Sequence, residues 1–168
     1  MSDIIKQIQE LQRRVLRLEK QKPFRQSIMI YIQKSLTISS VGTTTTIPIT
    51  VSDSSLANIS DWTLSHNRVF FNFTGWVRLS GHYHCILTCV HCFRMYFYDG
   101  STVTQKINHY VGQPAAISGG IAVTLPVYYF YVQPGNYVYF TVEIRSGSTG
   151  QIWNGHSLHE WLTFERVY

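Results

Sequence analysis

The chain has 168 residues, a length that suits one domain with a short appendage and not two full domains. Only 14% of the residues are charged, so the surface must be solvated by uncharged polar side chains or be partly hidden in an assembly. Half of the 14 cationic residues behind the net charge of +5 lie before residue 26, so the remainder is nearly neutral and nucleic-acid binding by it is not expected.

Residues 3–22 carry the clearest pattern, an apolar heptad seam. Its a and d positions are filled by five residues: Ile8 and Val15 at a, and Ile4, Leu11 and Leu18 at d. Arg14 stands at g and Glu19 at the following e, where the two can pair between chains of a parallel coiled coil. Pro23 ends the helix. We predict a coiled-coil stalk over residues 1–25 through which the chain self-associates.

The alternative is a lone amphipathic helix packed on its own domain, but the seam is narrow and the other faces are nearly all polar. Three heptads are marginal alone, so the following domain must share the work of association. β-Branched a positions with leucine at d lean toward dimers, and the copy number stays open on this pattern. The basic helix could also contact a polyanion or an acidic protein. We expect neither a secretory signal nor membrane insertion.

From residue 28 onward the apolar residues recur with the period of two that β-strands show. Strands are expected over residues 28–33, 36–51 with a break at Gly42, 69–77, 82–90, 93–98, 103–111, 121–132, 137–144 and 158–167. Pro48 should confine its segment to a sheet edge or a bulge. Loops are expected over residues 53–67, 112–120 and 146–157, with tight turns at Asp99-Gly100 and at 133–136. The fold class is therefore mainly β, an antiparallel sandwich or jelly roll over residues 26–168.

Three pieces of this domain resemble the trimeric jelly-roll heads of the complement-C1q and tumour-necrosis-factor type. Phe73-Thr74-Gly75-Trp76, followed by Ser80-Gly81-His82-Tyr83, is similar to the way that family enters a central strand. The segment 132–138 resembles its glycine-centred turn between two late strands, with Asn136 where an acidic residue is common. The segment from Asn154 to Phe164 resembles its closing strand.

The chain departs from that family because it shows neither a collagen repeat nor a secretion signal before the head. A coiled coil followed by such a head is similar to virus and bacteriophage spike, fibre and head-decoration proteins. That resemblance implies a homotrimer, and it is the reason for preferring three copies over two.

The densest group of reactive side chains is His82, His84, Cys85, Cys89, His91 and Cys92. In one strand His82 and His84 would share a face about 6.6 Å apart, whereas Cys85 and Cys89 would point the other way. Zinc needs four ligands, or three and a water, and this spacing does not gather them. We therefore expect no bound metal and no cofactor, with the cysteines as buried free thiols, which indicates a reducing compartment.

Catalytic groupings are missing from the sequence, so no catalytic residues are assigned. There is no Gly-x-Ser-x-Gly elbow, and the few acidic residues of the β-domain do not suggest two facing carboxylates. We expect the protein not to be an enzyme.

A ligand site is suggested by the loop over residues 146–157, which holds Gln151, Trp153, Asn154 and His156 among glycines. Aromatic and amide side chains on a loop suit contact with a glycan or a protein. Alternatively, Trp153 packs beneath its own loop or between subunits. The Tyr128–Tyr131 run is expected to fill the core and the intersubunit contacts.

The leading hypothesis is a virion structural protein, a trimeric spike, fibre or decoration protein involved in host attachment. The coiled coil would bind the capsid or another virion protein, and the head would face a host-surface glycan or protein. Such a chain would be assembled in the host cytoplasm and would reside on the virion surface. The alternatives are a cellular C1q-like oligomeric binding module and, second, a carbohydrate-active or metal-dependent enzyme.

Overall fold

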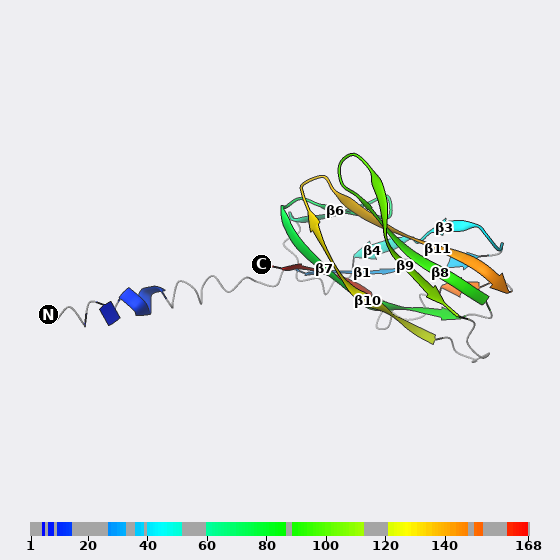
Figure 1. Ribbon diagram of the computed structural model, residues 1–168, viewed down its shortest axis with the longest axis horizontal. Coiled ribbons are helices and arrows are strands. Elements are labelled where there is room, and N and C mark those ends of the chain that lie inside the picture. The colour runs from blue at the N-terminus through cyan, green and yellow to red at the C-terminus, as the bar shows by residue number, and fades with distance from the viewer. Residues whose placement is uncertain are drawn as a thin grey trace.

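The computed structural model shows a two-layer β-sandwich and a short helical stretch near the N-terminus (Figure 1). It describes residues 5, 7–8, 10–14, 27–32, 36–38, 40–51, 60–86, 89–112, 121–147, 150–152 and 161–167. All the described residues among the first 14 are helical. No described helix is long and apolar enough to cross a membrane.

The first layer, sheet A, is built around the long strand β7 (Gly75–Ile86). Strand β10 (Ile121–Val132) pairs along one edge of β7, and β13 (Trp161–Val167) pairs along the other. The sheet continues from β13 to β1 (Ser27–Ile32) and ends at β4 (Ile49–Val51). Two short strands complete it beside the far end of β7: β12 (Gly150–Ile152) and β2 (Leu36–Ile38). Every pairing between strands is antiparallel.

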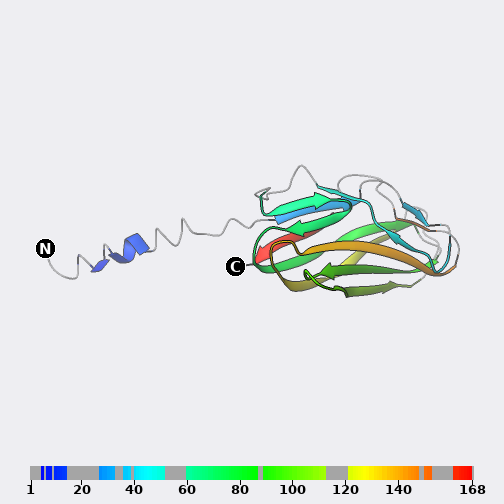
Figure 2. The ribbon, with the colours of Figure 1, turned by 90° about the horizontal axis from the view of Figure 1, so that it is seen from above.

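The second layer, sheet B, faces sheet A across the core (Figure 2). Its strands in spatial order are β5 (Trp62–Ser65), β6 (Arg68–Phe71), β11 (Tyr137–Gly147), β8 (Cys89–Tyr98) and β9 (Val103–Val111). The short β3 (Thr44–Thr46) also pairs with β11. Pro48 follows β3 and precedes β4, the edge strand of sheet A, which agrees with its prediction as an edge residue.

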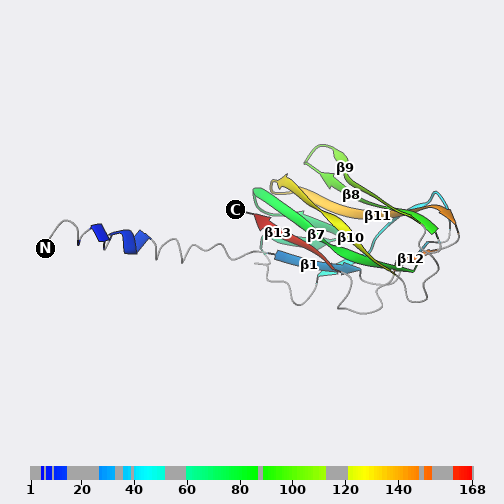
Figure 3. The same ribbon diagram turned by 60° about the horizontal axis from the view of Figure 1, so that its bottom comes forward.

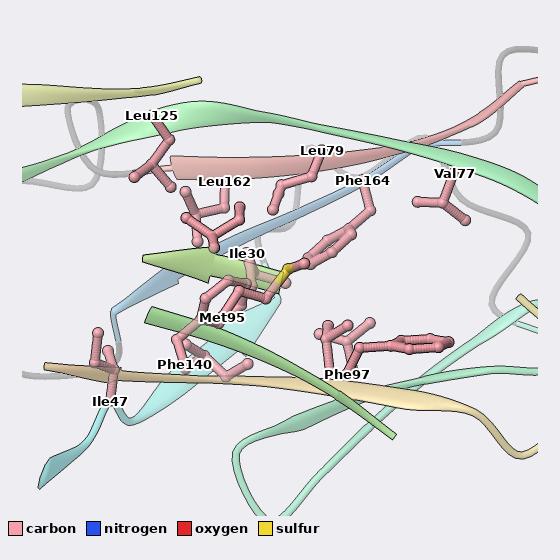
Figure 4. Close-up of a cluster of buried hydrophobic side chains, with 14 of the residues drawn as sticks. Ile30, Ile47, Val77, Leu79, Met95, Phe97, Leu125, Phe140, Leu162 and Phe164 are labelled. Atoms are coloured by element: carbon pink, nitrogen blue, oxygen red, sulfur yellow. The ribbon is translucent and has the colours of Figure 1, made fainter. Parts of the chain in front are cut away.

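The core lies between the two sheets and is filled by the alternate residues that both inner faces contribute (Figure 4). The most completely buried large side chains include Phe71, Phe93, Phe140, Phe164 and Ile30. The Phe71 ring contacts four other aromatic rings, which belong to sheet A, to sheet B and to the segment between β6 and β7: Trp62, Phe73, Phe130 and Phe164. Aromatic rings in edge-to-face contact therefore join the two layers.

One predicted loop was wrong, because part of residues 53–67 forms the β5–β6 hairpin. His66 and Asn67 both have positive φ, 50° and 60°, which is the conformation of a tight two-residue hairpin turn. Trp62, expected in a loop, is instead buried in β5. The hairpin was missed because neither of its turn residues is the glycine that usually announces such a turn.

Another predicted element, one strand over residues 82–90, was also wrong. Strand β7 begins at Gly75 and runs through Gly81 to Ile86, and β8 begins at Cys89 in the other sheet. Gly81 was read as a boundary, but it pairs with Leu125 and Leu162 in mid-strand. Strand β12 likewise lies within the predicted loop 146–157, and β11 extends to Gly147.

The two predicted tight turns are confirmed. At the tip of the β8–β9 hairpin the Asp99 carboxylate accepts hydrogen bonds from the backbone and the hydroxyl groups of Ser101 and Thr102. These bonds lower the pKa of Asp99 well below its usual range. Between β10 and β11, Asn136 Oδ1 accepts the amide hydrogen of Gln133, and the turn is also bonded to Phe71. Strands β1, β9 and β10 were likewise predicted at or within one residue of their ends.

Candidate functional site: an exposed aromatic surface on sheet A

The outer face of sheet A carries large aromatic side chains that no described residue covers. Along β7, Val77 and Leu79 point into the core, so Trp76 and Arg78 point outward. Strand β7 lies between β10 and β13 (Figure 3). The strand register sets Tyr131 and Val167 beside Trp76, and Tyr129 and Glu165 beside Arg78. We call Trp76, Tyr129, Tyr131 and Val167 the aromatic surface.

The aromatic surface is a group of neighbouring apolar side chains that each remain about half exposed to solvent, Val167 somewhat less. Trp76 keeps 52% of its area exposed and Tyr129 keeps 53%. Trp76 and Tyr131 touch edge to face, with ring centroids 5.6 Å apart and planes at 72°, so part of each ring face stays open. A contiguous apolar area of this kind marks an interaction site more often than an accident of composition.

A β-bulge in β10 decides that these tyrosines face outward. Leu125 pairs with Gly81 and Tyr128 pairs with Leu79, so Pro126 and Val127 together stand opposite one residue of β7. Proline is tolerated here because β10 pairs with β7 alone among the described strands. The extra residue shifts the alternation, so Phe130 enters the core while its two neighbours point out. The run was expected to fill the core and the intersubunit contacts: Phe130 does lie in the core, and the intersubunit contacts of Tyr129 and Tyr131 stay a prediction.

An ion pair lies next to the aromatic surface. Arg78 Nη1 is 3.0 Å from Glu165 Oε2, and both side chains are half-buried. The pair balances its own charge, so the surface is apolar and neutral overall. Burial against a partner would strengthen the attraction between the two charges, but both groups would lose their bound water. The two effects oppose each other, so the ion pair would add little affinity and would mainly select how the partner is oriented.

The aromatic surface lies at the end of the sandwich where β1 begins. Ser27, the first residue of β1, pairs with Glu165, and Val167 ends β13 beside Trp76. The predicted stalk precedes Ser27 in the sequence and would join the head beside this surface.

The predicted stalk residues are only partly described. Ile8 and Leu11 are helical, with 50% and 60% of their area exposed, and Arg14 is helical as well. Arg14 Nε lies 3.4 Å from Glu10 Oε1 in the same helix, and its pairing with Glu19 of another chain stays a prediction. The remaining predicted seam residues, Ile4, Val15 and Leu18, lie outside the described residues together with Glu19.

The predicted ligand loop is not tested either. Gln151 belongs to β12 and pairs through its backbone with Thr37 and Ile86, while its side chain lies outside the described part of the structure. Trp153, Asn154 and His156 lie wholly outside it.

The His and Cys residues that stand close together in the sequence are divided between the two sheets. His82 and His84 belong to β7 in sheet A, whereas Cys89, His91 and Cys92 belong to β8 in sheet B. Cys92 is a buried free thiol, and burial raises its pKa. The side chains of His84, Cys85 and Cys89 lie outside the described set. Among the side chains that are described, no three His, Cys, Asp or Glu gather in one place.

His91 links the two sheets inside the core. Its Nε2 is 2.8 Å from the Tyr83 hydroxyl, and its Nδ1 has no hydrogen-bond partner among the described residues. Burial, and then the nearby His109, lowers the pKa of His91 from 6.5 to about 4. A neutral imidazole in this place contributes a hydrogen bond and ring contacts to the core between the two sheets.

Comparison with known proteins rests on the fold alone. No family model and no curated protein matches the sequence. Among solved structures, murine APRIL at pH 5.0 superposes with a TM-score of 0.64 at 9% identity, over 85% of this chain and 99% of that one. Eiger TNF from S. frugiperda gives 0.58 at 8% identity, over 84% and 92% of the two chains. The structure of murine APRIL at pH 8.0 gives 0.62 at 7% identity, over 84% and 98%.

The fold is a tumour-necrosis-factor-like jelly roll. The sequence pieces that suggested this TNF-like fold fall where the resemblance implied. Gly75–Tyr83 lies in β7, the central strand of sheet A, and residues 133–136 turn between β10 and β11. Of the third piece, residues 161–164 lie in β13, between β7 and β1, and residues 154–160 lie outside the described residues.

Sequence reasoning did not single out Trp76 or Val167 as functional residues. The available signal was the alternation within β7 and β13, which places Trp76 opposite to Val77 and Val167 opposite to Phe164. That signal becomes readable only when the two strands are known to pair, because either residue alone looks like an ordinary strand residue.

Proposed function

We propose that this protein is a homotrimeric, non-enzymatic binding protein whose heads associate through the aromatic surface and whose N-terminal helix extends the same association as a coiled coil. The observation that carries the proposal is the exposure of Trp76, Tyr129 and Tyr131 on one face of a TNF-like jelly roll. Burying such rings between copies removes the apolar area that is otherwise in water.

The position of the aromatic surface also supports a common axis. It adjoins Ser27, so a three-stranded stalk would reach the heads where their aromatic surfaces meet. The exposed Ile8 and Leu11 are two of the seam positions that such a stalk would bury. The stalk and the head interface would both be needed for a stable trimer. A coiled coil of three heptads is marginally stable alone, and a head interface is strengthened when a stalk holds the heads together.

We further propose that the trimer belongs to a virion, as a spike, fibre or decoration protein, with the helix toward the capsid and the head outward for attachment. The proposal rests on the combination of a heptad stalk, a head poor in charge and the lack of catalytic groupings. Mass spectrometry of purified virions would detect the chain in fixed stoichiometry. A secreted product with processed N-terminus and no virion association would favour the cellular C1q-like module instead.

Sedimentation of the full chain tests the trimer directly. We expect three times the chain mass of 19.4 kDa at micromolar concentration, and monomers for Trp76→Glu combined with Tyr131→Glu, because a carboxylate buried between subunits has no partner. Tyr110→Glu is the matched control, since Tyr110 is 55% exposed on sheet B.

The control variant should stay trimeric. A wild-type monomer, or a trimer that survives the double change on sheet A, would exclude this interface. The far-ultraviolet circular dichroism spectrum must be unchanged in every variant, so that loss of folding is not mistaken for loss of assembly.

A further inference from the structure

The outer face of sheet B carries two features that the assembly does not use: stacked tyrosines and a surplus of positive charge. We call Tyr96, Tyr98, Tyr137 and Tyr139 the tyrosine ladder. The strand register sets Tyr98 beside Tyr137 and Tyr96 beside Tyr139, across β8 and β11. Association through sheet A leaves this face on the outside of the assembly.

The ladder rings stack on each other and leave their hydroxyl edges to solvent. The Tyr98 and Tyr137 centroids are 4.8 Å apart with planes at 24°, and the Tyr96 and Tyr139 centroids are 5.1 Å apart at 12°. Side chains of a strand stand roughly perpendicular to the sheet, so rings that stack across strands point their far edges outward. Among the described contacts, only the Tyr98 hydroxyl is engaged, donating to the Gly100 carbonyl. The other three hydroxyls can donate and accept.

Arginines on the same face exceed the acidic groups. The Glu143 carboxylate contacts both Arg94 and Arg145, and the Arg68 guanidinium lies 4.7 Å from the centre of the Tyr137 ring. On the outward side of β6, β8 and β11, three arginines stand against one glutamate, which leaves two positive charges over. On sheet A the outward charges Arg78 and Glu165 cancel.

The shape and chemistry of this face fit an extended anionic glycan. Guanidinium groups bind sulfate and carboxylate through paired hydrogen bonds, and a row of hydroxyls matches the hydroxyls of sugar rings. A protein partner would need an apolar anchor at the centre of the contact. The strongly exposed apolar residues of this face, Val103 and Tyr110, lie instead on the edge strand β9.

We propose that the tyrosine ladder, together with Arg68 and Arg145, binds an anionic polysaccharide chain. This inference deepens the binding role of the proposed function and rests on it for the outward position of sheet B. The surface belongs to one subunit, so an isolated head should keep its intrinsic affinity, and the trimer should add avidity.

Binding of the full chain to dextran sulfate, hyaluronan and uncharged dextran tests the proposal. We expect both charged polymers to bind, more weakly as salt rises, and dextran not to bind. Arg68→Gln with Arg145→Gln should weaken binding at least about tenfold. Arg13→Gln with Arg17→Gln is the matched control, because it removes the same charge from the basic helix at positions outside the predicted heptad seam and its g and e flanks, and should change affinity less than about twofold.

Three results would overturn the proposal. Equal losses in the two double variants would assign binding to general charge or to the helix. Equal binding of polyglutamate, with the same dependence on Arg68, would assign the face to an acidic protein. Unchanged affinity in Tyr96→Phe with Tyr139→Phe, which keeps the rings and removes the hydroxyls, would exclude the ladder.

Sedimentation of each variant separates this inference from the assembly. The Arg68/Arg145 variant should remain a trimer while it loses binding. The Trp76/Tyr131 variant should become a monomer and still bind a sulfated tetrasaccharide with wild-type affinity per head. A monomer that no longer binds the tetrasaccharide would show that the glycan site needs the assembly and would overturn the single-subunit site.

Discussion

The two outer faces of the sandwich use aromatic residues in opposite ways. On sheet A, Trp76 and Tyr131 meet at 72° and keep about half of their area exposed. On sheet B, Tyr96 and Tyr139 lie nearly parallel and are half-buried by each other and their neighbours. The first arrangement leaves apolar area without a partner, and the second satisfies the rings and presents only polar edges. Composition alone does not separate the two faces, because both are rich in aromatic residues.

The ion pair on sheet B is also more buried than the ion pair on sheet A. Removing the carboxylate from each pair should therefore give the largest difference in unfolding free energy between the two faces. The Arg94 and Glu143 side chains are each 8% exposed, whereas those of Arg78 and Glu165 are 38% and 18% exposed. Glu143→Leu leaves a buried guanidinium without its carboxylate and should cost about 3 kcal/mol or more of unfolding free energy. Glu165→Leu leaves Arg78 near water and should cost about 1 kcal/mol or less.

Urea unfolding of both variants, made in the monomeric Trp76/Tyr131 background, measures the contrast without a contribution from assembly. Equal losses would mean that water reaches Arg94 as readily as Arg78, and the two faces would then be electrostatically alike.

Acid sharpens the comparison through His91, the buried imidazole of sheet B that bonds to Tyr83 of sheet A. The pKa of the His91 imidazole is about 4 in the folded chain, whereas an unperturbed histidine has a pKa of 6.5. Below pH 6.5 the unfolded chain therefore takes up a proton that the folded chain does not. Stability should therefore fall by up to about 3 kcal/mol as pH drops from about 6.5 to about 4.

In His91→Gln this part of the pH dependence should vanish, although the variant is less stable at pH 7. Unfolding free energies at pH 7.0, 5.5 and 4.5 provide the measurement. A slope that is the same in the variant would assign the acid sensitivity to other groups.

The smallest expected contrast comes from single tyrosines. Tyr139→Ala removes a stacked, half-buried ring and should destabilise the monomeric background by about 1–2 kcal/mol. Tyr129→Ala removes an exposed ring and should cost less than about 0.5 kcal/mol there, while it weakens the trimer in an otherwise wild-type chain. Thermal unfolding and sedimentation together separate the effects. A large stability loss for Tyr129→Ala would mean that the ring supports its own fold.

The fold class could be predicted from the sequence because its strongest signals are local. The period of two in Ile28, Ile30 and Ile32 and the Asp99-Gly100 turn each depend on a few neighbouring residues. The β5–β6 hairpin escaped prediction because His66-Asn67 replaces the usual glycine turn. The break between β7 and β8 escaped it because Gly81 lies in mid-strand while no glycine marks the true end of β7.

The candidate site was harder to predict than the fold, because it is made by register. Trp76, Tyr131 and Val167 come from three strands far apart in the chain and become one surface only when β7 lies between β10 and β13. The sequence did indicate self-association through the seam that includes Ile8 and Leu11. It could not say which face of the head takes part, since that choice depends on pairing partners and not on any residue's own type.

The bulge at Pro126 and Val127 controls more than local geometry. A regular β10 would match Val127 with Leu79 and would turn Tyr129 and Tyr131 inward, sending Phe130 and Val132 to the water. The bulge therefore decides which residues in the second half of the strand face the core and which face the solvent. Deleting Val127 would remove the surplus residue and leave Tyr128 opposite Leu79, so Tyr129 and Tyr131 would still point outward without any bulge. Inserting one residue after Val127 without enlarging the bulge would instead turn both tyrosines inward, so the length of this short segment decides whether the head keeps its adhesive face.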